Sequence, residues 1–177
     1  MLNVITGLHG TGVAPSTNSY ESISTVTVGS GGSSSVTFSS IPSTYKHLQI
    51  RAMTNGTTSF NPTITFNGDS GSNYAWHYMD GNGSSATSGA GSSQAYMISG
   101  GASSTANVFA GHIMDILDYG NVNKYKTMRI LSGADKNGSG NIDLLSGLWM
   151  STSAISSLTI AGGTFGQYSS FALYGVK

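Results

Sequence analysis

From residue 20 onward, apolar and polar residues mostly alternate with a period of two, and clusters of Gly, Ser and Asn interrupt the alternation at short intervals. A period of two puts successive side chains on opposite faces of a strand, so this pattern is typical of half-buried β-strands. We expect strands at 23–28, 36–38, 48–53, 64–66, 74–79, 94–98, 108–117, 124–131, 142–150, 155–160 and 168–176. Such spacing predicts an all-β fold, an antiparallel two-sheet sandwich.

The composition supports this fold class. Only 8% of the 177 residues are charged, whereas the exposed faces of helices are normally built from Glu, Lys and Arg. Aromatic residues make up 10% of the chain, which is more than a disordered Ser/Gly-rich segment carries. The length suits one sandwich domain, which we place at residues 20–177.

Residues 1–19 have a different character, with several glycines, one proline and scattered apolar positions. They predict an extended N-terminal arm in front of the domain. We expect this arm to bind a neighbouring subunit or a larger shell through its apolar side chains, which are Leu2, Val4, Ile5, Leu8 and Val13.

Local patterns also predict turns and loops. Segments 23–28 and 36–38 flank a glycine-rich turn and are expected to form a hairpin. Segments 80–93 and 100–106 are almost without apolar residues and are expected to be surface loops.

Several function classes are disfavoured. The formal net charge is zero, so the chain lacks the basic surface that nucleic-acid binding requires. There is no cysteine for a disulfide framework or a cysteine-ligated zinc ion. The first residues contain neither a basic region nor a long apolar run, so we expect no signal peptide and no membrane span.

One segment, 135–143, resembles a calcium-binding loop because oxygen-bearing side chains alternate along it and a glycine stands at its sixth position. The candidate ligands are Asp135, Asn137, Ser139 and Asp143. Position twelve, where a bidentate Glu would close the site, is Ser146. We therefore favour an Asn-Gly hairpin turn over a calcium site, and we expect no metal or other cofactor.

Catalytic patterns are weak. Asp115 and Asp118 are three residues apart on one strand or turn, which would place them on opposite sides of a sheet. No Gly-x-Ser-x-Gly motif stands between a strand and a helix, and the histidines do not follow a metal-binding spacing. We expect no enzymatic activity. The aromatic residues Tyr20, Tyr45, Tyr74, Trp76 and Tyr78 would suit either a core or a sugar-binding surface, and we favour the core or a subunit interface.

Six segments together resemble a known family: 20–28, 36–45, 66–78, 116–127, 146–160 and 169–177. The most specific parts are Phe-Ser-Ser-Ile-Pro-Ser-Thr-Tyr at 38–45 and Ser-Ser-Phe-Ala-Leu-Tyr-Gly at 169–175. They resemble short virion structural proteins of tailed bacteriophages that infect cyanobacteria and other aquatic bacteria.

The resemblance implies a jelly-roll β-sandwich that forms a homotrimer and sits on the virion surface after assembly in the host cytoplasm. Two roles fit it. One is a capsid decoration (cement) protein that binds the major capsid protein and stabilises the shell, and the other is a tail-fibre or receptor-binding module that contacts tail proteins and host glycans. We expect decoration, because a chain of 177 residues without coiled-coil heptads is too short for a fibre shaft.

Overall fold

A computed structural model describes residues 19–177, and the arm residues named above lie outside this range. The described chain contains β-strands and no helix, and therefore no helix that is long and apolar enough to span a membrane. The strands are β1 (Tyr20–Thr27), β2 (Val36–Phe38), β3 (His47–Thr54), β4 (Thr63–Phe66), β5 (Tyr74–Gly81), β6 (Ala86–Gln94), β7 (Met97–Ile98), β8 (Ala110–Leu117), β9 (Lys126–Asp135), β10 (Gly140–Trp149), β11 (Leu158–Ala161) and β12 (Ser170–Val176).

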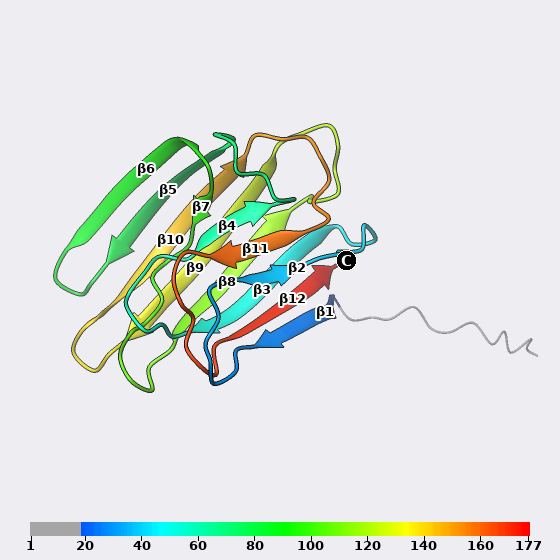
Figure 1. Cartoon of the computed structure of the whole chain (residues 1–177). Helices are drawn as coiled ribbons and strands as arrows, with labels where there is room; N and C mark the ends of the chain where they lie inside the picture. Colours follow the sequence, from blue (N-terminus) through cyan, green and yellow to red (C-terminus); the bar gives the residue numbers. More distant parts are fainter. Residues whose placement is uncertain (1–18) are drawn as a thin grey trace, which may run out of the picture.

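The strands form two antiparallel sheets that lie face to face (Figure 1). The large sheet has eight strands in the order β1-β12-β3-β8-β9-β10-β5-β6, and the small sheet has four in the order β2-β11-β4-β7. This arrangement confirms the expected all-β, two-sheet sandwich. Within it, β1-β12-β3-β8 and the small sheet β2-β11-β4-β7 have the strand order of the two sheets of a jelly roll, and β9, β10, β5 and β6 extend the large sheet beyond β8.

The core lies between the sheets and is built from alternate residues of each strand. On β8, for example, Met114 and Ile116 are buried against the small sheet, whereas Ile113 and Leu117 point the other way and are exposed. An aromatic group anchors one end of the core, where the rings of Tyr74 and Trp149 stack and Phe66 packs against both. Burial of these alternate residues supplies the main stabilisation of the sandwich.

Three expectations about local structure were wrong. Segments 23–28 and 36–38 do not form a hairpin, because β1 belongs to the large sheet and β2 to the small one. Segment 80–93 is not a loop: β5 continues to Gly81, a short turn follows, and β6 runs along β5 from Ala86. The strand expected at 155–160 begins later, because β11 starts at Leu158, although the loop residue Ile155 before it is also buried in the core.

Candidate interaction surface

The face of the large sheet that points away from the small sheet, here called the outer face, carries an unusual number of apolar side chains. Six of them lie on the five adjacent strands from β3 to β5 and are 44–63% exposed: Met53, Met79, Ile113, Leu131, Ile142 and Leu144. Scattered exposed apolar residues are normal on a protein surface, but a contiguous group of this size marks a contact surface. We call this group the apolar patch.

Strand register orders the apolar patch into two neighbouring rows. The first row crosses four strands and is formed by Ile113, Leu131, Leu144 and Met79, which are directly paired in that order. Four large side chains in line make a raised apolar ridge across the sheet. We call this row the apolar ridge.

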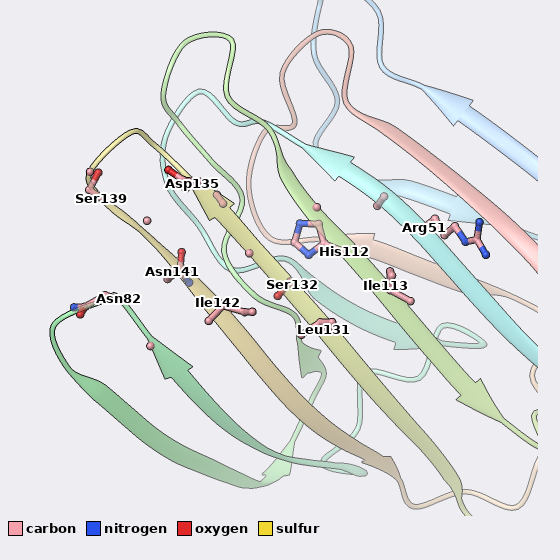
Figure 2. Close-up of a pocket in the computed structure, with 18 residues that line it drawn as sticks. Arg51, Asn82, His112, Ile113, Leu131, Ser132, Asp135, Ser139, Asn141 and Ile142 are labelled. Carbon is pink, nitrogen blue, oxygen red and sulfur yellow. The ribbon is translucent and has the colours of Figure 1, made fainter.

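The second row lies two residues further along the same strands and is formed by Gly111, Gly133, Ile142 and Gly81. Three of these four positions have no side chain, so the surface is hollowed beside the ridge. A depression of about 780 Å³ lies here, and Figure 2 shows Ile113, Leu131 and Ile142 along it. We call this row the glycine groove.

Polar side chains border the patch. Arg51 lies over the rings of Tyr20 and Tyr174, with its guanidinium carbon 5.1 and 5.2 Å from their centroids, and its Nε donates a hydrogen bond to Gln49. Gln49 in turn donates to the Asp115 carboxylate through a bond of 2.8 Å. This side of the patch is therefore held by a connected polar and cation–π network.

Two exposed charges stand at opposite ends of β9. Arg129 lies beyond the apolar ridge, and Asp135 lies beyond the glycine groove. Neither is in an ion pair within residues 19–177, although Arg129 donates to the Ser146 hydroxyl and Asp135 accepts from the Asn137 backbone. Both charges remain available to a partner.

The inner face carries a buried polar row at the level of the groove. His112, Ser132 and Asp143 are aligned across β8, β9 and β10 and are 3%, 4% and 8% exposed. Ser132 Oγ donates to Asp143 Oδ2 at 3.4 Å, and Asn141 Nδ2 donates to the same oxygen at 2.8 Å. Burial raises the pKa of Asp143 and lowers the pKa of His112 to about 4.

This row has the residue types of a serine hydrolase but a different geometry. His112 Nε2 is bonded to Thr54 rather than to Ser132, and the hydrogen bond of Ser132 goes to the carboxylate. The backbone of Gly100 covers the serine so closely that an added Cβ would lie 1.8 Å from Ser132 Oγ. A nucleophile needs contact with its base and access to a substrate, and this arrangement offers neither.

The four candidate calcium ligands belong to the β9–β10 hairpin. Asp135 is exposed on the outer face, whereas Asp143 is buried on the inner face. Asn137 and Gly138 have φ angles of 56° and 101°, which suit the tight turn between the strands, and Lys136 N donates to Ser139 O across it. The two carboxylates that would bring charge to an ion thus lie on opposite sides of the sheet.

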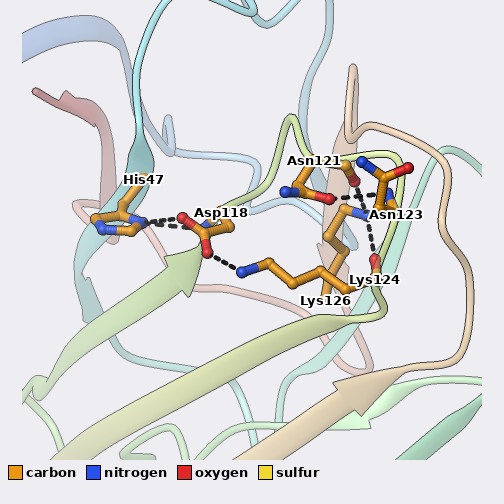
Figure 3. Close-up of polar contacts among 6 residues, drawn as sticks. All are labelled: His47, Asp118, Asn121, Asn123, Lys124 and Lys126. Atoms are coloured by element: carbon orange, nitrogen blue, oxygen red, sulfur yellow. Dashed lines mark hydrogen bonds and ion pairs between the residues drawn. The ribbon is translucent and has the colours of Figure 1, made fainter.

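A polar cluster that the sequence did not indicate closes the far end of β8 and β9 (Figure 3). The Asp118 backbone donates to His47 Nδ1 at 2.9 Å, and the Asp118 carboxylate pairs with Lys124, whose hydrogen bond lowers the pKa of that carboxyl. The ammonium group of the buried Lys126 donates to three backbone carbonyls, those of Asn121, Lys124 and Thr152. These contacts fix the loop between the two strands.

The aromatic residues of β5 divide between the core and one margin of the sandwich. Tyr74 is fully buried, while Trp76 and Tyr78 are half-buried and lie over Gly91 and Gly89 of the edge strand β6. An added Cβ at either glycine would come within 2.6 Å of the ring. The rings therefore serve to hold β6 in place.

Sequence reasoning missed the apolar patch, although a signal was present. Strands with one solvated face alternate apolar and polar residues, yet several neighbouring positions here are both apolar, as in Ile113-Met114, Ile130-Leu131 and Leu144-Leu145. One member of each pair is buried and the other belongs to the patch. Comparisons with protein-family models, curated proteins and solved structures find no match for this chain.

Proposed function

We propose that this chain is a non-enzymatic structural protein of a phage virion, of the capsid-decoration type, and that the outer face of its large sheet is the surface through which it is assembled. The apolar patch carries this proposal. Side chains such as Met79, Ile142 and Leu144, which are 56–63% exposed, are stabilised when a partner covers them. The resemblance of the sequence to phage virion proteins supplies the location.

The row of hydrolase-type residues described above does not have a catalytic geometry. His112, Ser132 and Asp143 are buried, with the backbone of Gly100 over Ser132, and their hydrogen bonds do not link a base to a nucleophile. The partners in this proposal are further copies of the chain and the major capsid protein.

The tail-fibre alternative has less support. It requires aromatic side chains that are free to stack on host glycans. Tyr74 lies in the core and Trp76 and Tyr78 are packed on β6, whereas the exposed Tyr125 and Tyr168 lie in two separate loops, so these two rings are not gathered on one strand or loop. We therefore favour decoration.

The test is the number of copies in a purified virion, measured by quantitative mass spectrometry against the major capsid protein. A decoration protein is present in hundreds of copies, on the order of the capsid protein itself, whereas a dozen or so copies would place the chain in the tail and overturn the proposal. Substituting Leu144→Asp puts a charge on the exposed patch and is expected to abolish incorporation. Val122→Asp changes a residue that is equally exposed but lies outside the patch, and it should be incorporated normally.

A further inference from the structure

We propose that the partner on the outer face is a second copy of this chain, and that the two copies pack face to face about a two-fold axis, with the apolar ridge of each in the glycine groove of the other. This inference rests on the proposed function in one respect, which is that it uses the same outer face as the contact surface. The arrangement follows from the order of the residues along β8, β9, β10 and β5.

The ridge and the groove are adjacent parallel rows, which makes the face complementary to itself. Consider an axis that lies midway between the rows, parallel to the sheet and perpendicular to its strands. Rotation by 180° about it turns the second copy face down and exchanges the two rows, while each strand comes to lie over the same strand of the other copy. Aligned packing of two sheets, with strands within about 30° of each other, is a common arrangement in proteins.

The residue pairs that this rotation creates fit by size. Ile113 comes over Gly111 of the second copy, Leu131 comes over Gly133, and Met79 comes over Gly81. On β10, Leu144 meets Ile142, which is also apolar. Three large side chains thus enter positions where the facing surface has none, and each contact occurs twice because the interface is isologous.

The charges fit as well. Arg129 lies two residues before Leu131, and Asp135 lies two residues after Gly133, so the same rotation brings Arg129 to Asp135 of the second copy. On the two strands beside β9, Asp115 of β8 meets Phe109 and Ser146 of β10 meets Gly140, so these outer positions bring no like charges together. Charge complementarity of this kind sets the register of an interface.

The outer face is also large enough for a stable dimer interface. Five strands spaced about 4.8 Å apart and about eight residues long cover roughly 600 Å² of flat sheet. Its corrugated accessible surface is larger and approaches the ~800 Å² per partner of a standard stable interface. The chain has no net charge, so two copies do not repel one another at long range.

The first measurement is the mass of the full-length chain in solution, by light scattering and by sedimentation, at concentrations of tens of micromolar. We expect twice the 18.2 kDa of one chain. A monomer would overturn the proposal, and so would a trimer, because an isologous face joins copies in pairs. The virion copy number tests the proposed function separately, since a dimer can form whether the chain decorates the capsid or not.

The second experiment fills the groove. A Cβ at Gly111 meets nothing within 4 Å, and its φ is not in the left-handed region, so Gly111→Val folds without strain and blocks the position that receives Ile113. We expect this variant to be monomeric and folded, with a melting temperature that, unlike that of the wild type, does not depend on protein concentration. Gly29→Val is the matched control, because Gly29 is equally open but lies outside the large sheet. A Gly111→Val chain that still dimerises would overturn the proposal.

The third experiment tests the register of the dimer by reversing the charges of two facing residues. Arg129→Asp alone and Asp135→Arg alone each place like charges opposite one another twice in a homodimer. Each variant should therefore raise the dissociation constant of the dimer at least tenfold. Mixed together, the two variants make a heterodimer in which both contacts are again complementary, so dimers should return. If the mixture stays monomeric while the wild type dimerises, the proposed two-fold register is wrong.

Discussion

Thr54 Oγ1 and His112 Nε2 lie 2.7 Å apart in the buried layer between the two sheets, and this bond joins β3 to β8 from the inside. The other ring nitrogen of His112, Nδ1, is buried and has no hydrogen-bond partner within residues 19–177. An imidazole in such surroundings is held in its neutral form, because a second proton would bring an unpaired charge into the core. This accounts for the lowering of its pKa to about 4.

The stability of the protein should therefore depend on pH through His112. The unfolded chain binds this proton near pH 6.5 and the folded chain only near pH 4, so stability is greatest above 6.5 and falls as the pH is lowered through that window. The free energy of unfolding should differ by about 3 kcal/mol between the two ends of this window, because each unit of pKa shift corresponds to 1.36 kcal/mol. Urea unfolding at pH 7 and at pH 4.5 measures it. The neutral His112→Gln, which can keep the bond to Thr54, should lose much less stability between these two pH values, and an identical loss in both proteins would show that His112 is not the group responsible.

Asp143 should behave in the opposite sense. Burial, opposed in part by hydrogen bonds and reinforced by the nearby Asp80, raises its pKa above the unfolded value of 3.8. A carboxyl with a raised pKa favours the folded state at low pH and disfavours it as the pH rises through the folded pKa. Asp143→Asn keeps an oxygen to accept from Asn141, so we expect a higher free energy of unfolding at pH 7 and no gain at pH 3. A loss of stability at pH 7 would show that the carboxylate charge is needed.

Lys126 and Lys124 provide a matched pair. Lys126 is 1% exposed and its ammonium satisfies three carbonyls, so Lys126→Met leaves those acceptors buried without a donor and should lower stability by about 2–4 kcal/mol. The Lys124 side chain is 55% exposed and pairs with Asp118 at the surface, where screening by solvent leaves such a pair little net stabilisation. Lys124→Met should therefore be nearly neutral in thermal and urea unfolding. Equal effects in the two variants would mean that the carbonyl contacts of Lys126 do not stabilise the loop.

Substitution of Gly91 should destabilise the protein more than substitution of a glycine that has open space around it. Its added Cβ would lie 2.6 Å from the indole of Trp76, so Gly91→Ala must displace the ring, and overpacking of this kind costs about 1–3 kcal/mol. The control is Gly29→Ala, since open space surrounds that position. Differential scanning calorimetry should show a lower melting temperature for the first variant only. A Gly91→Ala protein as stable as the wild type would show that the ring has room to move.

Part of this architecture could be predicted because it depends on neighbouring residues. A strand was expected at 108–117, and β8 occupies Ala110–Leu117. The Asn-Gly pair at 137–138 predicted a hairpin turn, and β9 and β10 are joined there. Both predictions rest on local backbone preferences that hold in any fold.

The errors share a different cause. Segment 86–94 has almost no apolar residues, but it forms β6 because the backbone of β5 pairs with it and the rings of Trp76 and Tyr78 cover its glycines. Likewise, the glycine-rich stretch after β1 led to the expectation of a hairpin, yet β1 pairs with β12 at the opposite end of the chain. Pairing with a distant strand overrides weak local preference.

The sequence by itself determined the fold class, the sandwich and most of the strands, because a period of two must place one face of each strand in a core. Only the tertiary structure decided which strands are neighbours, and with that which side chains share a face. Ile113, Leu131, Leu144 and Met79 come from four separate strands and form a ridge only because register aligns them across the sheet. The surface on which the proposed function rests is thus a product of long-range pairing, which no local pattern encodes.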